Sequence, residues 1–326
     1  MNKLYPLKFK PIFKEKIWGG SRMKEALGLD FSPLPNCGEA WMLSGVEGNQ
    51  SVVSNGFLAE NELNELVEVY MENLVGDTVF EKHGQEFPIL IKFIDSNDWL
   101  SIQVHPDDLL ARKRNLGNGK TEMWYVMDAA KDAKLINGFS EQVNKQLYMQ
   151  HLEKKTLKEI LNFEQVEKGD VFYIPAGRVH SLGPGILLAE IQQTSDTTYR
   201  IYDWDRIQPD GSFRELHTKE ALDAIDFKLY DSYKSSYDKK INESINLVES
   251  PYFISNLLKL DRAIAKDFTM TDSFVAYVCT NGKCKINYPD GTVELQKGEV
   301  VLVPAIINDI SILPDPATEL LEVYTH

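Results

Sequence analysis

Short apolar runs separated by turn residues dominate the hydrophobic pattern of the N-terminal two thirds of the chain. The runs lie at 88–95 (PILIKFID), 99–105 (WLSIQVH), 122–129 (EMWYVMDA), 134–138 (KLING), 171–175 (VFYIP) and 187–193 (LLAEIQQ). Short runs rich in Val, Ile, Phe, Tyr and Trp are typical of β-strands. Residues 96–98 (Ser-Asn-Asp) predict a hairpin-like turn between the first two runs. We therefore expect a mainly β structure.

Other segments follow a helical pattern. Between 60 and 76, apolar residues from Leu63 to Leu74 recur at helical spacing, and Gly76 is a typical helix stop. Further helices are expected at 107–117, at 216–226 and, with a break near Thr156, in a polar insert at 140–164.

The C-terminal segment reads as a second β unit. Asn281-Gly282 and Asp290-Gly291 predict two hairpins, because these dipeptides suit the tight turns between antiparallel strands. The stretch KGEVVLVPA (297–305) repeats KGDVFYIPA (168–176) almost residue for residue. This echo predicts two copies of one β fold.

A polar stretch, YDSYKSSYDKKINES (230–244), predicts a linker between the two units. A chain of 326 residues also exceeds the usual size of a single hydrophobic core. We therefore divide the chain into residues 1–240, which include the helical insert at about 140–164, and residues 241–326.

Composition and charge narrow the function classes. A formal net charge of -14 argues against nucleic acid or an anionic membrane as a partner, although Lys and Arg gathered locally could still bind an anionic substrate. No apolar stretch reaches the roughly 18 residues of a membrane span, and the N-terminus has no secretory pattern. Three cysteines without CxxC spacing fit a reducing compartment, so we expect a cytoplasmic protein.

Candidate chemistry begins at GDVFYIPAGRVHSL (169–182), where a buried strand ends in a tight turn and His180 follows. A lone histidine after a turn is more often a core or surface residue than a metal ligand. Gln103 and His105 favour the metal-ligand interpretation of His180. Residues two apart in a strand point to the same face, so an amide oxygen and an imidazole could bind one ion together.

Lys120 and Glu122, at the start of another strand, show the same spacing. Such a pair is commonly just two rim charges. Together with the two histidines and Gln103, however, Glu122 completes a mixed nitrogen and oxygen set suited to Zn²⁺, Mn²⁺ or Fe²⁺. Glu190, Asp196 and Arg200 then follow His180 along an apolar strand.

Six motifs in order along the chain resemble type I phosphomannose isomerase (mannose-6-phosphate isomerase), a zinc enzyme family of the cupin superfamily. They are IWGG (17–20), GEAWMLSG (38–45), QVHPDD (103–108), GKTEMWYV (119–126), PAGRVHSLGPG (175–185) and AEIQQTSDTTYRIYDW (189–204). The insert at 140–164 is much shorter than the helical domain of the longer members. In this respect the chain resembles the short subgroup of the family.

The resemblance implies a fold and a site. The fold is two cupin-type (jelly-roll) β domains, the second without metal because KGEVVLVPA is not followed by the G-x-x-H of the first. One Zn²⁺ per chain would be held by Gln103, His105, Glu122 and His180. The catalytic pocket would be lined by Arg200, Lys120, Asp196 and Glu190.

The activity implied is interconversion of mannose 6-phosphate and fructose 6-phosphate through an enediol(ate). Two other interpretations are an Fe(II) cupin oxygenase and a non-catalytic sugar-phosphate-binding cupin. The presence of both Lys120 and Arg200 favours the isomerase. The residues leave the general base open among Lys120, Asp196 and Glu190, and they make no prediction of oligomeric state.

Overall fold

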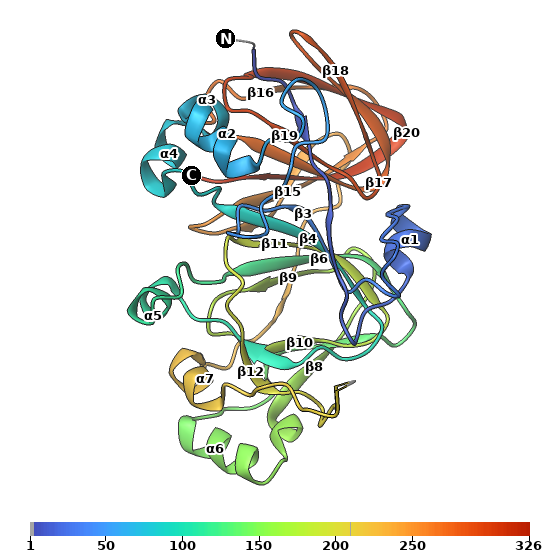
Figure 1. Cartoon of the computed structure of the whole chain (residues 1–326). Helices are drawn as coiled ribbons and strands as arrows, with labels where there is room; N and C mark the ends of the chain where they lie inside the picture. The colour runs from blue at the N-terminus through green and yellow to red at the C-terminus, as the bar shows by residue number, and fades with distance from the viewer. Residues whose placement is uncertain (1–2, 209) are drawn as a thin grey trace.

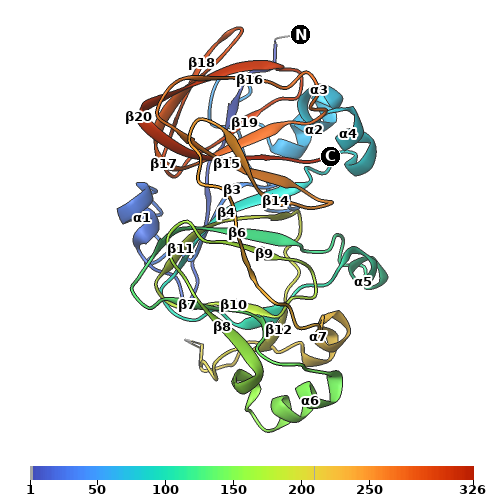
Figure 2. The same ribbon diagram turned by 180° about the vertical axis from the view of Figure 1, so that it is seen from behind.

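The computed structural model describes residues 3–208 and 210–326 and shows a chain built of three antiparallel sheets in layers (Figure 1). The C-terminal sheet lies at one end of the molecule, the central sheet follows, and the outer sheet lies beyond it with α6 and α7 on its far side. The view from behind shows the same order (Figure 2). The predicted mainly β fold class is confirmed.

The C-terminal sheet contains eight strands. Their order is β1 (Leu7–Lys8), β19 (Val300–Val303), β17 (Val275–Tyr288), β20 (Asp309–Tyr324), β15 (Ile254–Leu260) and β14 (Ser244–Glu249), with β16 (Ile264–Asp267) paired to β20 and β18 (Gly291–Gln296) paired to β17.

The other two sheets face each other. The central sheet has the order β13 (Lys234–Ser235), β9 (Val171–Ile174), β6 (Glu122–Ala129), β11 (Ile186–Gln193), β4 (Ile89–Ser96), β3 (Glu39–Leu43) and β2 (Ile12–Lys14). The outer sheet has the order β12 (Tyr199–Tyr202), β5 (Ile102–Val104), β10 (His180–Leu182), β7 (Lys134–Phe139) and β8 (Leu161–Gln165).

The helices are short and lie on the outside of the molecule (Figure 1). They are α1 (Arg22–Leu27), α2 (Leu63–Tyr70), α3 (Glu72–Val75), α4 (Asp77–His83), α5 (Asp108–Lys113), α6 (Lys145–Glu153), the 3₁₀ turn η1 (Leu157–Ile160) and α7 (Thr218–Ala224). Within the described residues, none of these helices has the length and apolar character needed to cross a membrane.

Four apolar clusters hold the layers together. One fills the space between the central and outer sheets, and a second joins the far face of the outer sheet to α6, η1 and α7. The largest lies between the central sheet, the C-terminal sheet and α2, α3 and α4, and a fourth lies within the C-terminal sheet. Burial of apolar surface on both faces of the central sheet explains why its strands read as continuous apolar runs.

The turn predicted at 96–98 is not a hairpin. β4 pairs with β3 and β11 of the central sheet, whereas β5 pairs with β10 and β12 of the outer sheet. Residues 96–98 therefore carry the chain from one sheet to the facing one. The backbone N–H of Asn97 donates to the carbonyl of Trp18 at 2.9 Å, a contact with a distant segment that local sequence does not reveal.

The helix predicted for 60–76 forms, but it is divided into α2 and α3 at Met71, whose φ is 47°. The predicted stop at Gly76 is confirmed. In the insert, α6 and η1 confirm a break near Thr156. Its last residues, 161–165, form β8 instead of helix, because they pair with β7.

In the C-terminal segment, Tyr288 pairs with Gly291, which confirms the hairpin at Asp290-Gly291. The hairpin at Asn281-Gly282 is wrong: β17 runs through this position without reversing. Register shifts in its pairing with β20 occur on both sides of Gly282, as expected for β-bulges. Glycine is common both in turns and at β-bulges, so its presence did not distinguish the two.

The echoed segments form corresponding strands, β9 and β19. The C-terminal sheet is not made of C-terminal residues alone, because β1 pairs with β19 in the register Leu7 to Leu302. The division into residues 1–240 and 241–326 stays a prediction.

Gly282 offers a test of the bulge. Its φ is +76°, and a Cβ there would overlap the carbonyl oxygen of Ala317. Gly48 has a φ of +73° with open space around it. Gly48→Ala should cost only the backbone strain of about 1–2 kcal/mol. Gly282→Ala should cost more, because crowding adds about 1–3 kcal/mol.

Urea unfolding of the two variants against the parent protein measures the difference. Equal losses of stability would show that β17 and β20 move apart freely at this point, contrary to the packing described.

Candidate active site

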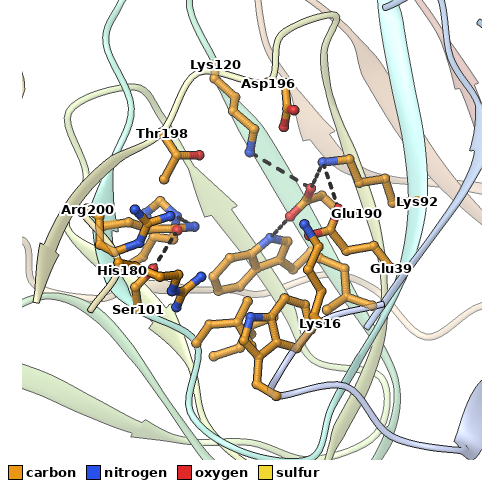
Figure 3. Close-up of a pocket in the computed structure, with 17 residues that line it drawn as sticks. Lys16, Glu39, Lys92, Ser101, Lys120, His180, Glu190, Asp196, Thr198 and Arg200 are labelled. Atoms are coloured by element: carbon orange, nitrogen blue, oxygen red, sulfur yellow. Dashed lines mark hydrogen bonds and ion pairs between the residues drawn. The ribbon is translucent and has the colours of Figure 1, made fainter. Parts of the chain in front are cut away.

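Six of the eight predicted site residues line a cavity of about 290 Å³ between the outer and central sheets (Figure 3), and the other two, His105 and Glu122, lie beside Lys120 and His180. In the outer sheet, Gln103 on β5 is paired with His180 on β10 and with Arg200 on β12. In the central sheet, Glu190 on β11 is paired with Lys92 on β4. Residues paired across strands share a face, so the row on the outer sheet and the row on the central sheet face each other across the cavity.

Three buried ligand-type residues form a compact cluster at the inner end. His105, Glu122 and His180 each offer one atom within 4.8 Å of the others. The Nε2 of His105 lies 3.6 Å from one carboxylate oxygen of Glu122, and the Nε2 of His180 lies 3.4 Å from the other. The spacing is that of side chains arranged around a common point.

Each imidazole is oriented by its other nitrogen. His105 Nδ1 lies 2.9 Å from the carbonyl oxygen of Thr197, and His180 Nδ1 lies 2.8 Å from that of Arg178. A carbonyl only accepts, so the proton is assigned to Nδ1 and the Nε2 lone pairs face the cluster. This arrangement is typical of metal-ligating histidines.

Electrostatics favour the same protonation state. Burial lowers the pKa of His180 to about 3, and burial together with the nearby Lys120 ammonium holds the pKa of His105 well below its usual value. Both rings are therefore neutral near pH 7, which is the form that binds a metal.

Glu122 is the residue most in need of a cation. It is fully buried, and burial together with the charge of Glu190 raises its pKa to about 7 although Lys120 opposes the shift. Its Oε1 is buried and accepts no hydrogen bond from the described residues. Such an orphaned carboxylate oxygen between two imidazole nitrogens fits a divalent metal ion.

Gln103 can complete the set. Its Nε2 lies 3.2 Å from Nε2 of His180, and with the imidazole proton on Nδ1 the amide N–H donates to the Nε2 lone pair. Rotation of the amide by 180° exchanges its nitrogen and oxygen, which places an oxygen ligand at this position. All four predicted metal ligands are thus neighbours, and their role as ligands stays a prediction.

A row of alternating charges crosses the central sheet from the cluster. Lys120 Nζ forms an ion pair with Glu122 and lies 3.9 Å from Glu190. Glu190 is 3.4 Å from Lys92, which is 4.0 Å from Glu39 (Figure 3). The carboxylates of Glu122 and Glu190 outweigh burial, so the pKa of Lys120 is raised.

The remaining predicted residues also border the cavity. Arg200 donates from one terminal nitrogen to the carbonyl of Glu215 at 2.8 Å, while its buried Nε has no partner among the described residues. Burial, and next the charge of Arg214, lower the pKa of Arg200. Asp196 is exposed at the wall and lies beside Lys120 (Figure 3).

Sequence reasoning did not single out several residues of the cavity wall. These are Lys16, Trp18, Glu39, Lys92, Trp124 and Arg214. Trp18, Glu39 and Trp124 lie within the motifs IWGG, GEAWMLSG and GKTEMWYV, and Lys16 directly precedes the first of them. A methyl group on Gly38 would lie 2.6 Å from Lys16 and 2.8 Å from Trp18, so this glycine lets the two segments pack together at the cavity. For Arg214 the sequence carries no such signal.

Comparison with known proteins agrees with this geometry. The family model described as phosphomannose isomerase type I, catalytic domain, matches residues 7–134. Mannose-6-phosphate isomerase ManA of Bacillus subtilis is 35% identical over 302 residues, which cover 92% of this chain and 93% of that protein. The mannose-6-phosphate isomerase of Streptococcus mutans is 33% identical over 303 residues and covers 93% of each chain.

The fold agrees as well as the sequence. The crystal structure of the mannose 6-phosphate isomerase from Bacillus subtilis matches with a TM-score of 0.87 and 32% identity, covering 98% of this chain and 99% of that one. With such similarity over nearly the whole of both chains, this protein is an enzyme that belongs to the type I phosphomannose isomerase family.

Proposed function

We propose that this protein is a zinc-dependent isomerase that interconverts mannose 6-phosphate and fructose 6-phosphate. The observation that carries the proposal is the buried His105–Glu122–His180 cluster, which borders a cavity rich in Lys and Arg through His180. A coupled isomerase assay on mannose 6-phosphate, before and after chelation and with zinc restored, tests it. An iron-dependent oxygenase would instead consume oxygen, and a binding protein would turn over nothing.

The metal ligands would be Gln103, His105, Glu122 and His180. The donor set fits, because two neutral imidazoles, an orphaned carboxylate oxygen and an amide suit zinc and leave room for substrate. A zinc ion held there would act as a Lewis acid that polarises the substrate carbonyl.

The chain's own residues would handle the proton and the developing charge. Isomerisation moves a proton between C1 and C2 through an enediol(ate), so a group that exchanges protons must face those carbons. Lys120 and Asp196 lie together at the wall near the cluster. Glu190 is less free, because its Oε2 accepts from Trp124 Nε1 at 2.8 Å and its Oε1 lies 3.4 Å from Lys92.

Arg200 would stabilise negative charge. It is always cationic and is carried by the strand next to Gln103, and its Nε has no protein partner among the described residues. Rigid, preplaced donors of this kind are the largest single contribution in many enzymes.

The rest of the chain would support this site. Residues 241–326 would form a cupin-type domain without metal, since the turn after β19 carries neither the glycine nor the histidine that follow β9. The substrate would be a small sugar phosphate, and we propose a cytoplasmic location.

Loss of either histidine should remove the metal. In His105→Ala and His180→Ala, zinc affinity should fall by at least ~10²-fold, more than the ~10- to 100-fold typical for a residue that only supports a ligand. Metal analysis of the purified proteins measures this directly. His151→Ala is the control, because His151 lies on α6 and bonds to Thr156. Full zinc content in both ligand variants would refute the assignment.

Arg200→Ala should slow the chemical step. If Arg200 stabilises charge that develops on the enediolate, kcat should fall by about 10²- to 10³-fold, the scale seen for lost oxyanion donors. KM should change little, because a group acting only in the transition state lowers kcat and kcat/KM together. Steady-state kinetics with zinc content checked measure both constants. A raised KM with kcat intact would make Arg200 a ground-state binding residue instead.

A further inference from the structure

Arg214 reaches the cavity from outside the sheets that build it. It lies in the segment that follows β12, where an isolated bridge between Ile207 and Phe213 folds the chain back. β12 is the edge strand of the outer sheet, so this segment extends the cavity wall beyond Arg200. Going outward from His180, the order across the outer sheet is Gln103, Arg200 and then this segment.

The guanidinium of Arg214 is held in place by a buried acid. Its Nε donates to Asp203 Oδ2 at 2.7 Å, and one terminal nitrogen pairs with Asp203 Oδ1. The Asp203 side chain is only 7% exposed, whereas that of Arg214 is 21% exposed. This fork fixes the plane of the guanidinium and leaves its second terminal nitrogen for another acceptor.

Charge balance separates this end of the cavity from the other. Along the central sheet, three lysines alternate with three glutamates, two of them buried, so each of these cations has a carboxylate neighbour. Arg214 pairs with the buried acid Asp203, and the acids that act on Arg200 are this same Asp203 and the exposed Glu215, so Arg200 has no buried carboxylate of its own among the described residues. Asp196 lies by Lys120 and away from Arg200 (Figure 3). An anion is therefore favoured at the arginine end.

We propose that Arg214 binds the phosphate group of the substrate, with Asp203 as the residue that positions it. The proposal rests on the proposed function, because a hexose 6-phosphate carries its phosphate at the opposite end of the carbon chain from C1 and C2. With C1 and C2 at the histidine cluster, the phosphate lies outward, past Arg200 and toward Arg214. Arg200 then acts on the reacting carbons and Arg214 on the anion that anchors the sugar.

Kinetics of the zinc-loaded variants test the assignment. Arg214→Ala should raise KM for mannose 6-phosphate by about 10- to 100-fold with kcat within about 3-fold of the parent, as expected when a charged hydrogen bond present in ground and transition states is lost. Arg214→Lys keeps the charge without the fork and should recover part of the loss. Asp203→Asn should raise KM less than Arg214→Ala does.

Arg114→Ala is the matched control. Arg114 also forms an ion pair with an aspartate, Asp223 at 2.7 Å, with a similar exposure of 24%, but it does not line the cavity. Its KM should equal that of the parent. An unchanged KM in Arg214→Ala, or a fall in kcat alone, would overturn the assignment, and an unchanged KM in Asp203→Asn would overturn the positioning role.

A binding measurement separates this inference from the proposed function. Calorimetry with inorganic phosphate should show binding to the zinc-loaded protein that weakens by about 10- to 100-fold in Arg214→Ala and is unaltered in Arg114→Ala. If the parent protein fails to isomerise mannose 6-phosphate, the proposed function fails, and this titration still tests Arg214 as an anion-binding residue. Equal phosphate binding by both variants would refute it.

Discussion

The register of the outer sheet is the constraint on which the site depends. Gln103 stands opposite His180 on one side and opposite Arg200 on the other, so a single register brings three polar side chains to the cavity. Their neighbours Ile102 and Val104 point the other way, into the apolar cluster beneath α6 and α7. A slip of one residue would exchange the two faces and bury the polar groups in that cluster. The apolar face therefore enforces the geometry of the polar one.

The central sheet meets a different demand, which is to hold charges away from water. Taking ions out of water costs several kcal/mol each unless they are well paired. Glu39 and Glu190 are paired in the same way. Glu39 accepts a hydrogen bond from Trp41 Nε1 at 2.8 Å, and Glu190 accepts one from Trp124 Nε1 at 2.8 Å. Each carboxylate also has lysine neighbours. The pKa of Glu39 is lowered to about 2, since its lysines outweigh its burial. The pKa of Glu190 is lowered too, so Glu39 and Glu190 stay ionised, as preorganised electrostatics require.

The outer and central sheets contribute different charges to the cavity. The whole chain carries a net charge of -14, so it offers an anionic substrate little long-range attraction. Attraction must arise locally, and at the arginine end of the cavity Arg200 and Arg214 have one buried acid, Asp203, between them. The lysine and glutamate row instead shapes the environment of the reacting carbons. One end with the candidate metal ligands and another with two arginines suit a substrate that is a sugar at one end and an anion at the other.

Apolar runs in the sequence predict β4, β5, β6, β7, β9 and β11, because such runs record which faces are buried, whereas residues 161–165 follow a helical pattern and form β8. The sequence by itself also determined the candidate ligands: Gln103 with His105, and Lys120 with Glu122, are pairs two residues apart on one strand, and motif resemblance joined them to His180. Predictions from local pattern were wrong where pairing with distant segments determines the structure. Residues 96–98 look like a hairpin but cross between sheets, and Asn281-Gly282 looks like a turn but is a bulge against β20. Arg214 carries no motif, and only the fold of the segment after β12 brings it to the cavity. The physical reason is that a side chain's face follows from local periodicity, whereas its neighbours across a cavity follow from pairings between residues far apart in the chain.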